Sequence, residues 1–160
     1  MLDIDTDTNP DGAVAALWEE HREKLVRFAG ALVGPDDAHD LASEVFFDVV
    51  GDLIDGRVDH PTAFLYRAAS NRAHKLRRSR ERRWQRNLHA VSHRVVEAPD
   101  SFVDVRHAVA LLSVAQRAVV FLVYWEDRTE SDTADILQIS PGTVRRHLVR
   151  ARIHLRKALQ

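Results

Sequence analysis

Hydrophobic residues recur at steps of three and four over most of the chain, which is the period of an amphipathic helix. In the first half, this pattern predicts helices over about 13–33 and about 36–53, and a third helix from His60-Pro61 to about Trp84 or beyond. Alternation with a period of two, which is typical of strands, is rare. The pattern therefore predicts an all-α fold.

The second half begins after a stretch without a clear period. Residues 87–100 are predicted to form a linker between two small helical domains. Beyond it, Ser113 is followed three residues later by Gln116, as in a capping box. This start favours a buried helix for the run VVFLVYW at 119–125, although its β-branched residues would also permit a strand.

The last thirty residues predict two short helices joined by a tight turn. Thr129 and Ser140 are suited to cap the two helices, and Pro141 occupies a first helical position, where a missing N–H has no cost. The second of these helices has an apolar stripe at steps of four, three and four. The stripe consists of Val144, Leu148, Ala151 and Leu155.

A different side of this last helix is basic. Thr143, Arg146 and Arg150 project from it, and no Asp or Glu follows Asp135. A recognition helix in the DNA major groove requires an apolar stripe for docking and a free, basic, hydroxyl-bearing side. The plainer interpretation is an amphipathic terminal helix with solvated arginines, but the short turn and the paired caps favour a helix-turn-helix.

The net charge of −1 conceals an uneven distribution of charge along the 160 residues. Residues 1–59 contain four Lys and Arg against fifteen Asp and Glu, whereas residues 60–86 contain nine Lys and Arg and a single acid. The last twenty residues again contain Lys and Arg but no Asp or Glu. Two separated basic segments behind an acidic first third indicate two contacts with nucleic acid and one with a basic partner.

The predicted second helix carries acids on the side opposite its apolar row. Phe47 is expected to be partly exposed among Asp37, Asp40, Glu44 and Asp48. These residues alone permit two interpretations, a solvated acidic face or a surface that docks on a basic partner helix.

The predicted third helix combines arginines with aromatic and amide side chains. Its apolar side gives way after Leu76 to the run RRSRERRWQR. A basic helix of this kind can follow phosphates while planar side chains stack on unpaired bases and an amide reads a base edge. The alternative is a helix whose arginines only contact solvent. A second basic surface in the same chain makes this alternative less favoured.

Composition excludes several classes of site. The sequence contains no Cys, which excludes disulfides, thiolate zinc sites and cysteine nucleophiles. The acidic, polar N-terminus does not resemble a signal peptide, and no uncharged run approaches the roughly 18–20 residues that span a bilayer. We therefore expect a cytoplasmic protein without membrane insertion.

Three segments together resemble the small, extracytoplasmic-function type of bacterial RNA polymerase sigma factor. Residues 37–50 read DAHDLASEVFFDVV, similar to the family's D-A-E-D-L-x-Q-E-x-F helix. Residues 60–78 read HPTAFLYRAASNRAHKLRR, similar to N-P-x-A-W-L-Y-R-I-A-x-N-x-x-x-x-x-x-R. Residues 139–159 read ISPGTVRRHLVRARIHLRKAL, similar to I-S-x-G-T-V-K-S-R-L-x-R-A-R-x-x-L-R-x-x-L. Each motif is moderately specific alone, but all three in this order are a strong signal.

The resemblance implies a domain plan and partners. Residues 1–12 would be a disordered lead-in, 13–86 a domain like sigma region 2, 87–100 the linker, and 101–160 a helix-turn-helix domain like sigma region 4. Region 2 would bind the clamp helices of core RNA polymerase and the −10 promoter element. Region 4 would bind the −35 element, with the polymerase flap as a further contact. An anti-sigma factor, which the family often has, is a further expected partner.

The resemblance also implies the residues of each surface. It assigns polymerase binding to Asp37, Asp40, Leu41, Glu44 and Phe46. It assigns −10 binding to Arg67, Asn71, Arg72, Lys75, Arg77 and Arg78, with Asn71 near a flipped base and the basic residues on the backbone. It assigns −35 binding to Thr143, Arg145, Arg146, His147 and Arg150. Because the polymerase carries out the chemistry, no catalytic residue, metal or cofactor is expected.

The chain departs from the family pattern at several positions. Arg146 and His147 stand where the family often has Ser and Arg, so the −35 preference need not follow the usual one. Around the helix-turn-helix, Asp127-Arg128 replaces Gly-Leu and Gln138 replaces Gly. These changes leave the protein class intact and leave the promoter sequence open.

Two other classes compete with this interpretation. A freestanding helix-turn-helix regulator would bind duplex DNA alone, commonly as a dimer on repeated half-sites, but it gives no role to the acidic second helix or the long basic third helix. A metal-dependent hydrolase is prompted by nine histidines and the His39-Asp40 dipeptide. Such a site needs several converging ligands, and the sequence contains no H-E-x-x-H motif.

Overall fold

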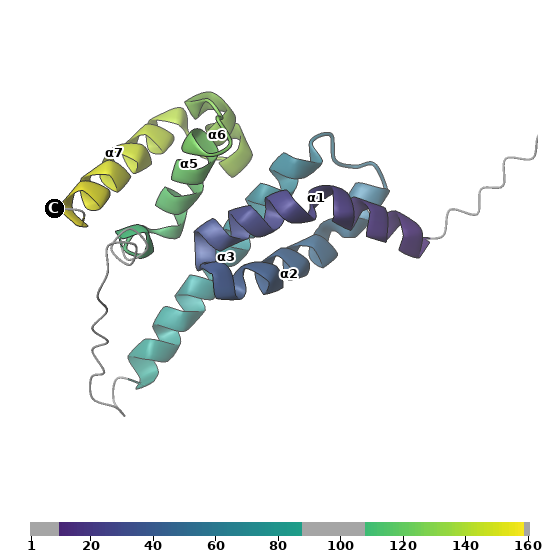
Figure 1. Ribbon diagram of the computed structural model, residues 1–160, viewed down its shortest axis with the longest axis horizontal. Coiled ribbons are helices and arrows are strands. Elements are labelled where there is room, and N and C mark those ends of the chain that lie inside the picture. The colour runs from purple at the N-terminus through teal and green to yellow at the C-terminus, as the bar shows by residue number, and fades with distance from the viewer. Residues whose placement is uncertain (1–9, 88–107, 159–160) are drawn as a thin grey trace, which may run out of the picture.

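The computed structural model describes residues 10–87 and 108–158, and the regular elements within these ranges are helices. The first domain consists of α1 (Pro10–Val33), α2 (Pro35–Ile54) and α3 (Pro61–Asn87). The second consists of α5 (Val114–Tyr124), α6 (Glu130–Leu137) and α7 (Pro141–Ala158). The predicted all-α fold is confirmed. Figure 1 shows the second domain at one end of the α1–α3 bundle, with the C-terminal half of α3 projecting beyond α1 and α2.

Proline marks the start of the long helices. α2, α3 and α7 begin at Pro35, Pro61 and Pro141, where the fixed φ of proline suits the first turn and its missing N–H needs no partner. α1 likewise begins at Pro10. Residues 10–12 are therefore helical, and their assignment to a disordered lead-in was wrong because the apolar period alone does not register a proline start.

The predicted linker is only partly described. Asn87, expected to be its first residue, is the last residue of α3. The remainder, 88–100, lies outside the described residues, as do residues 1–9 of the lead-in. None of the described helices is both long enough and apolar enough to cross a membrane.

Aromatic side chains organise the core of the first domain. Phe28 of α1 and Tyr66 of α3 are 0% and 1% exposed, with 4.5 Å between their ring centroids. Trp18 of α1 packs edge-on against Phe46 of α2 at 5.1 Å. Each pair joins two helices, so burial of these rings fixes how the surfaces of α2 and α3 lie relative to each other.

The predicted caps of α5 and α6 are present. The Ser113 hydroxyl accepts the Gln116 amide at 3.2 Å, and the Gln116 side chain accepts the Ser113 amide at 2.9 Å. The Thr129 hydroxyl accepts the amide of Asp132 at 3.0 Å. The helical interpretation of the run after Ser113 is thus confirmed, and the strand alternative is wrong, because the capping box fixes a helical start.

The apolar stripe of the last helix is buried as predicted. Val144, Leu148 and Ala151 are at most 3% exposed, whereas Leu155 is half-buried. Val144 and Leu148 pack with Val119 of α5 and Ala134 of α6. This packing holds α7 by one side and leaves its basic side outward.

The turns that flank α6 contain two strained residues. Asp127 and Gln138 have φ values of 51° and 54°, in the left-handed region that favours glycine. Both stand at positions where the family pattern has Gly. At Gln138 the conformation lets the backbone N–H cap the carbonyls of Ala134 and Asp135.

We expect Gln138→Gly to stabilise the helix-turn-helix. A residue with a Cβ in the left-handed region costs roughly 1–2 kcal/mol, and the greater flexibility of unfolded glycine offsets part of the gain. The free energy of unfolding, measured by urea denaturation, should rise by about 0.5–1 kcal/mol. Gln138→Ala, which keeps the Cβ, is the control; equal stability of the two variants would contradict strain at this turn.

Candidate nucleic-acid interface

The acidic side of α2 carries an exposed aromatic residue. Phe47 is 67% exposed between exposed Asp40, Glu44 and Asp48, as predicted. Its ring rests edge-on against the buried ring of Phe46, with 5.7 Å between centroids. An apolar ring held outward among carboxylates is suited to contact a basic, partly apolar partner surface.

Leu41 and Phe46 do not belong to this exposed surface. They are 2% and 0% exposed and lie in the core of the first domain. The assignment of these two residues as direct polymerase contacts is therefore corrected, because the helical period turns them away from the acidic side. Their place in the motif is explained by packing, and the aromatic residue left for a partner is Phe47, which the assignment omitted.

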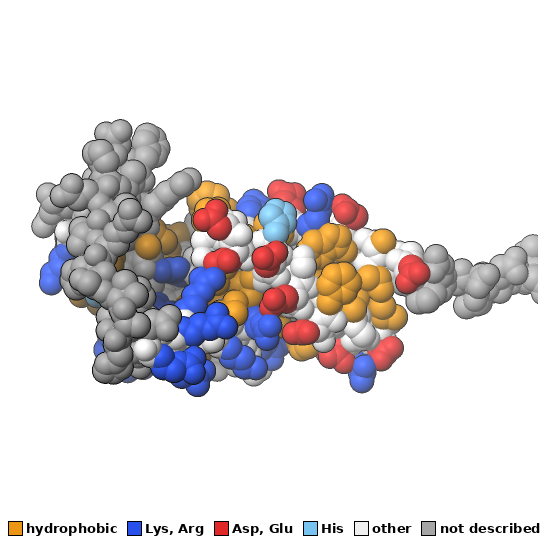
Figure 2. All heavy atoms as spheres, turned by 90° about the horizontal axis from the view of Figure 1, so that it is seen from below, with side chains coloured by type: hydrophobic (Ala, Val, Ile, Leu, Met, Phe, Trp, Pro, Cys, Tyr) orange, Lys and Arg blue, Asp and Glu red, His pale blue; other side chains and the backbone are white. Residues whose placement is uncertain are grey.

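Two acids of α2 are paired with arginines of α3. The Glu44 carboxylate accepts Nε and Nη2 of Arg72 at 3.0 and 2.7 Å. The Asp37 carboxylate accepts Nη2 of Arg80 at 2.7 Å. Figure 2 shows acidic side chains beside a cluster of Lys and Arg on this side of the molecule. The sequence analysis did not single out Arg80, because an ion pair between two helices does not affect the hydrophobic period of either helix.

Three of the six predicted −10 residues form an exposed ridge on α3. Asn71, Lys75 and Arg78 follow one another at steps of four and three, which places them on one side of the helix. The side chains of Asn71 and Lys75 make no hydrogen bond or ion pair to any other described residue. This ridge is free to meet nucleic acid.

The other three predicted −10 residues are engaged within the fold. Arg72 forms the pair with Glu44. Arg77 donates from Nε to Glu81 at 3.0 Å and from Nη1 to the carbonyl of Leu112 at 3.4 Å. Arg67 lies 5.6 Å from the ring centroid of Phe64, and its buried Nε lacks a partner among the described residues.

The first turn of α7 orders a chain of polar groups. The Ser140 hydroxyl accepts the Thr143 amide at 3.1 Å and lies 2.9 Å from the Thr143 hydroxyl. Arg146 donates from Nη2 to the Thr143 hydroxyl at 3.3 Å. The exposed guanidinium of Arg146 is thereby drawn toward the N-terminal end of the helix, the end that meets base edges in helix-turn-helix complexes.

The remaining predicted −35 residues differ in their surroundings. Arg150 is exposed one turn beyond Arg146. Arg145 donates from Nε and Nη2 to Glu130 of α6 at 3.2 and 3.0 Å. His147 is half-buried, and its Nδ1 is buried without a partner among the described residues. Thr143, Arg146 and Arg150 thus form the free basic side, and the other two flank it.

The pKa values of two histidines, one in each domain, lie below the usual range of this residue. Burial, then Arg146 and Arg150, and finally His74 of α3 lower the pKa of His147. Burial, then Arg78 and Arg77, lower the pKa of His74.

The hydrophobic run of α5 ends in exposed aromatic residues. Tyr124 and Trp125 are 57% and 69% exposed, so the expectation of a buried run fails for its last two side chains. The Tyr124 hydroxyl accepts Nε of Arg152 in α7 at 3.0 Å. The hydrophobic pattern could not predict the exposure of these two side chains, because α5 ends at Tyr124.

A metal-binding cluster is not found in the described ranges. Within residues 10–87 and 108–158, no group of three His, Cys, Asp or Glu side chains is placed to hold a metal ion. His39, whose neighbour Asp40 prompted the hydrolase alternative, is exposed on α2.

Comparisons with known proteins identify the family of the chain. The family model for Sigma-70 region 2 matches residues 17–83, and that for Sigma-70, region 4, matches residues 102–155. A comparison with curated protein sequences finds no match. The fold is similar to that of a sigma factor, RpoE from Bartonella quintana, in its co-crystal structure with the anti-sigma factor NepR. The TM-score is 0.70 at 22% identity, covering 91% of this chain and 95% of that one.

The two family models together cover well over half of the 160 residues, in the order in which the two domains occur. Sigma factors bind core RNA polymerase and promoter DNA to direct the initiation of transcription. The chain belongs to the sigma-70 family of sigma factors.

Proposed function

We propose that this sigma factor divides its contacts among three surfaces. The acidic side of α2 meets core polymerase, the exposed ridge of α3 meets the −10 element, and the free side of α7 meets the −35 element. The observation that carries this assignment is the placement of an exposed acidic surface with an aromatic residue beside two exposed basic ridges on one chain. On this proposal the factor has no catalytic residue and works in the cytoplasm beside the polymerase.

The polymerase surface consists of Asp37, Asp40, Glu44 and Phe47, with Leu41 and Phe46 beneath it. Carboxylates there complement basic clamp helices, and Phe47 supplies the apolar contact that makes such a surface bind tightly. Two of the carboxylates already hold arginines of α3. Basic residues of the polymerase would replace these arginines and leave them free for promoter phosphates.

The two DNA surfaces read different forms of the promoter. On α3, Asn71 has the amide that can pair with the edge of an unstacked base, while Lys75 and Arg78 meet phosphates. On α7, Arg146 and Arg150 are long enough to reach guanine edges in the major groove, and Thr143 accompanies them. Arg145 and His147 flank this surface, and Arg145 would contact the backbone after leaving Glu130.

An anti-sigma factor is a further proposed partner. The structurally similar RpoE is bound to the anti-sigma factor NepR. Here the exposed aromatic residues Phe47, Tyr124 and Trp125 lie on both domains and offer an inhibitor contacts to each.

In vitro transcription with core RNA polymerase on a genomic promoter library tests the proposal as a whole. Specific new transcripts should require this protein. Those transcripts should be lost with Asn71→Ala. Absence of both core binding and new transcripts, combined with dimeric binding to duplex half-sites, would favour the freestanding regulator.

We expect Arg146→Ala to relax promoter recognition at one position of the −35 element. A bidentate arginine–guanine pair contributes about 1–3 kcal/mol of discrimination, or roughly tenfold or more in relative use of matched and mismatched promoters. Promoter-library transcription with core polymerase measures this ratio. Arg152→Ala is the matched control, because Arg152 is on the same helix but bonds to Tyr124; equal relaxation by both variants would contradict base reading by Arg146.

We expect Phe47→Ala to weaken binding to core polymerase by about tenfold or more, as for a central aromatic contact. Because Phe47 is exposed, the free energy of unfolding should change little. Affinity for labelled core polymerase and urea denaturation measure the two effects separately. Ile54→Ala, at an exposed residue at the end of α2, is the control. Unchanged affinity of the Phe47 variant would remove this residue from the polymerase surface.

A further inference from the structure

The basic character of α3 continues beyond the residues assigned to the −10 element. The helix runs to Asn87, and Figure 1 shows its C-terminal half projecting past α1 and α2. Arg82, Arg83 and Arg86 are exposed in this part of the helix. None of the three surfaces described above includes these arginines.

The helical period places two of these arginines on the same side as Asn71. At about 100° per residue, Arg82 and Arg86 lie roughly 20° and 60° from Asn71 around the helix axis, whereas Arg83 lies roughly 120° away. The steps from Arg78 to Arg82 and from Arg82 to Arg86 are those of helix neighbours. Arg82 and Arg86, the distal pair, therefore continue the exposed ridge of α3.

Hydrogen bonds within the fold leave the distal pair available. Arg82 donates from Nε to the carbonyl of Arg78 at 3.2 Å, and its two Nη groups lie outside this bond. Arg86 forms no ion pair with another described residue. Glu81, the single acid of α3, accepts Nε of Arg77 at 3.0 Å. The positive charge of the distal pair is therefore not neutralised by a carboxylate of its own helix.

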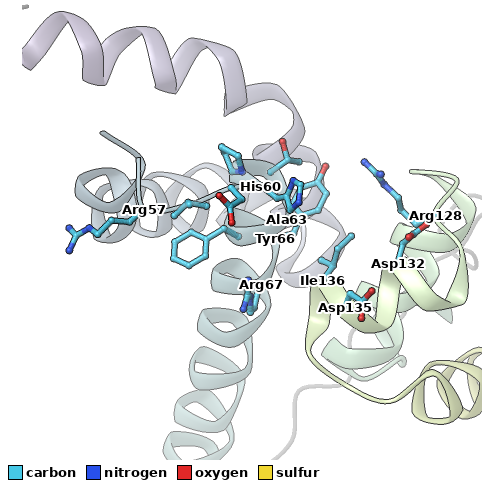
Figure 3. A pocket seen from close by; sticks show the side chains of 14 residues that line it. Arg57, His60, Ala63, Tyr66, Arg67, Arg128, Asp132, Asp135 and Ile136 are labelled. Atoms are coloured by element: carbon cyan, nitrogen blue, oxygen red, sulfur yellow. The ribbon is translucent and has the colours of Figure 1, made fainter. Parts of the chain in front are cut away.

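The start of α3 has different surroundings. It faces a cleft of about 790 Å³, and Figure 3 shows Arg67 on one side of it and Arg128, Asp132 and Asp135 on the other. Carboxylates on the facing wall disfavour a phosphate backbone there. Further DNA contacts of α3 are therefore expected at its C-terminal end.

The length of α3 determines how far along the promoter the distal pair can reach. A rise of 1.5 Å per residue places Arg82 and Arg86 about 16 and 22 Å from Asn71 along the helix. With about 3.4 Å between successive base pairs, this distance spans about five to seven base pairs. The chain continues from α3 to the domain assigned to the −35 element, so the C-terminal end of α3 is its upstream end.

The chemistry of the distal pair fits phosphates of duplex DNA. Because α7 reads a duplex, the promoter returns to a double helix between the two elements. Guanidinium groups bind phosphate oxygens with charge-assisted hydrogen bonds, and such contacts position a protein without reading sequence. The distal pair has this chemistry at the place where the double helix resumes.

We propose that Arg82 and Arg86 bind the phosphates of the double helix immediately upstream of the melted −10 element. This proposal rests on the assignment of Asn71 and its ridge to that element. One continuous helix then holds the unpaired strand at Asn71 and the adjoining duplex at the distal pair. The distal pair stabilises the open promoter whatever the sequence of the upstream duplex.

The experiment uses the full chain bound to core polymerase and compares two DNA probes. The first is the single strand of the −10 element alone. The second is a fork, in which the same strand is joined to a duplex that extends one helical turn upstream and excludes the −35 element. The variants are Arg82→Ala and Arg86→Ala. Arg83→Ala is the matched control, because it removes the same exposed charge from another side of the same part of α3.

We expect Arg82→Ala and Arg86→Ala each to weaken binding of the fork by about threefold to tenfold, with unchanged affinity for the single strand. Each should also lower the slope of log affinity against log salt by about 0.9, because one phosphate contact is lost. Arg83→Ala should change neither affinity by more than about twofold. Neutral methylphosphonates about five to seven base pairs upstream should remove the difference between wild type and Arg82→Ala. Unchanged far-UV circular dichroism, checked first, shows that the helices remain folded.

Three results would overturn the proposal. Equal weakening by Arg82→Ala and Arg83→Ala would indicate a general effect of charge. Equal losses on the fork and the single strand would indicate contact with the unpaired strand. Weaker binding of core polymerase by Arg82→Ala or Arg86→Ala would indicate contact with an acidic surface of the polymerase.

Failure of the underlying assignments looks different. If the −10 assignment is wrong, Asn71→Ala leaves the affinity for both probes unchanged. If the sigma assignment is wrong, the wild-type protein produces no promoter-specific transcripts with core polymerase.

Discussion

Burial of α5 on two sides is the constraint on which the rest of the structure depends. Toward its own domain, Val119 holds the helix-turn-helix together and so turns the basic side of α7 outward. Toward the first domain, Phe121 packs on Phe28 and Tyr66, the same pair that joins α1 to α3. A single helix therefore fixes the recognition helix, the core of region 2 and the junction between the two domains.

Ion pairs join the acidic side of α2, which we assign to polymerase, to the basic helix α3, which we assign to the promoter. Exposed pairs such as Arg72–Glu44 and Arg80–Asp37 each contribute only about 0–1 kcal/mol to stability. Weak pairs are easily exchanged, so a basic partner on α2 can displace these arginines at little cost. The acidic and basic parts of the sequence therefore pair with each other across α2 and α3 in the free chain.

The helices, the caps and the helix-turn-helix were predictable from the sequence because they depend on local signals. Ser113, Thr129 and Ser140 accept the amides that capping predicts, and the stripe from Val144 to Ala151 is buried. The motif alone could not separate buried from exposed members, so Leu41 and Phe46 were assigned to a surface that Phe47 occupies. Arg80 and Arg117 make contacts with residues that are distant in sequence. The hydrophobic period of a helix cannot predict such contacts.

The placement of Arg117 shows why such contacts matter for a protein with two short domains. A small helix-turn-helix buries little apolar surface and is marginally stable alone. Docking adds the Phe121 contacts and satisfies a helix end with a charged donor. The same contacts hold α5 against α1 and α3. Contacts between the two domains therefore supplement the small core that each domain has of its own.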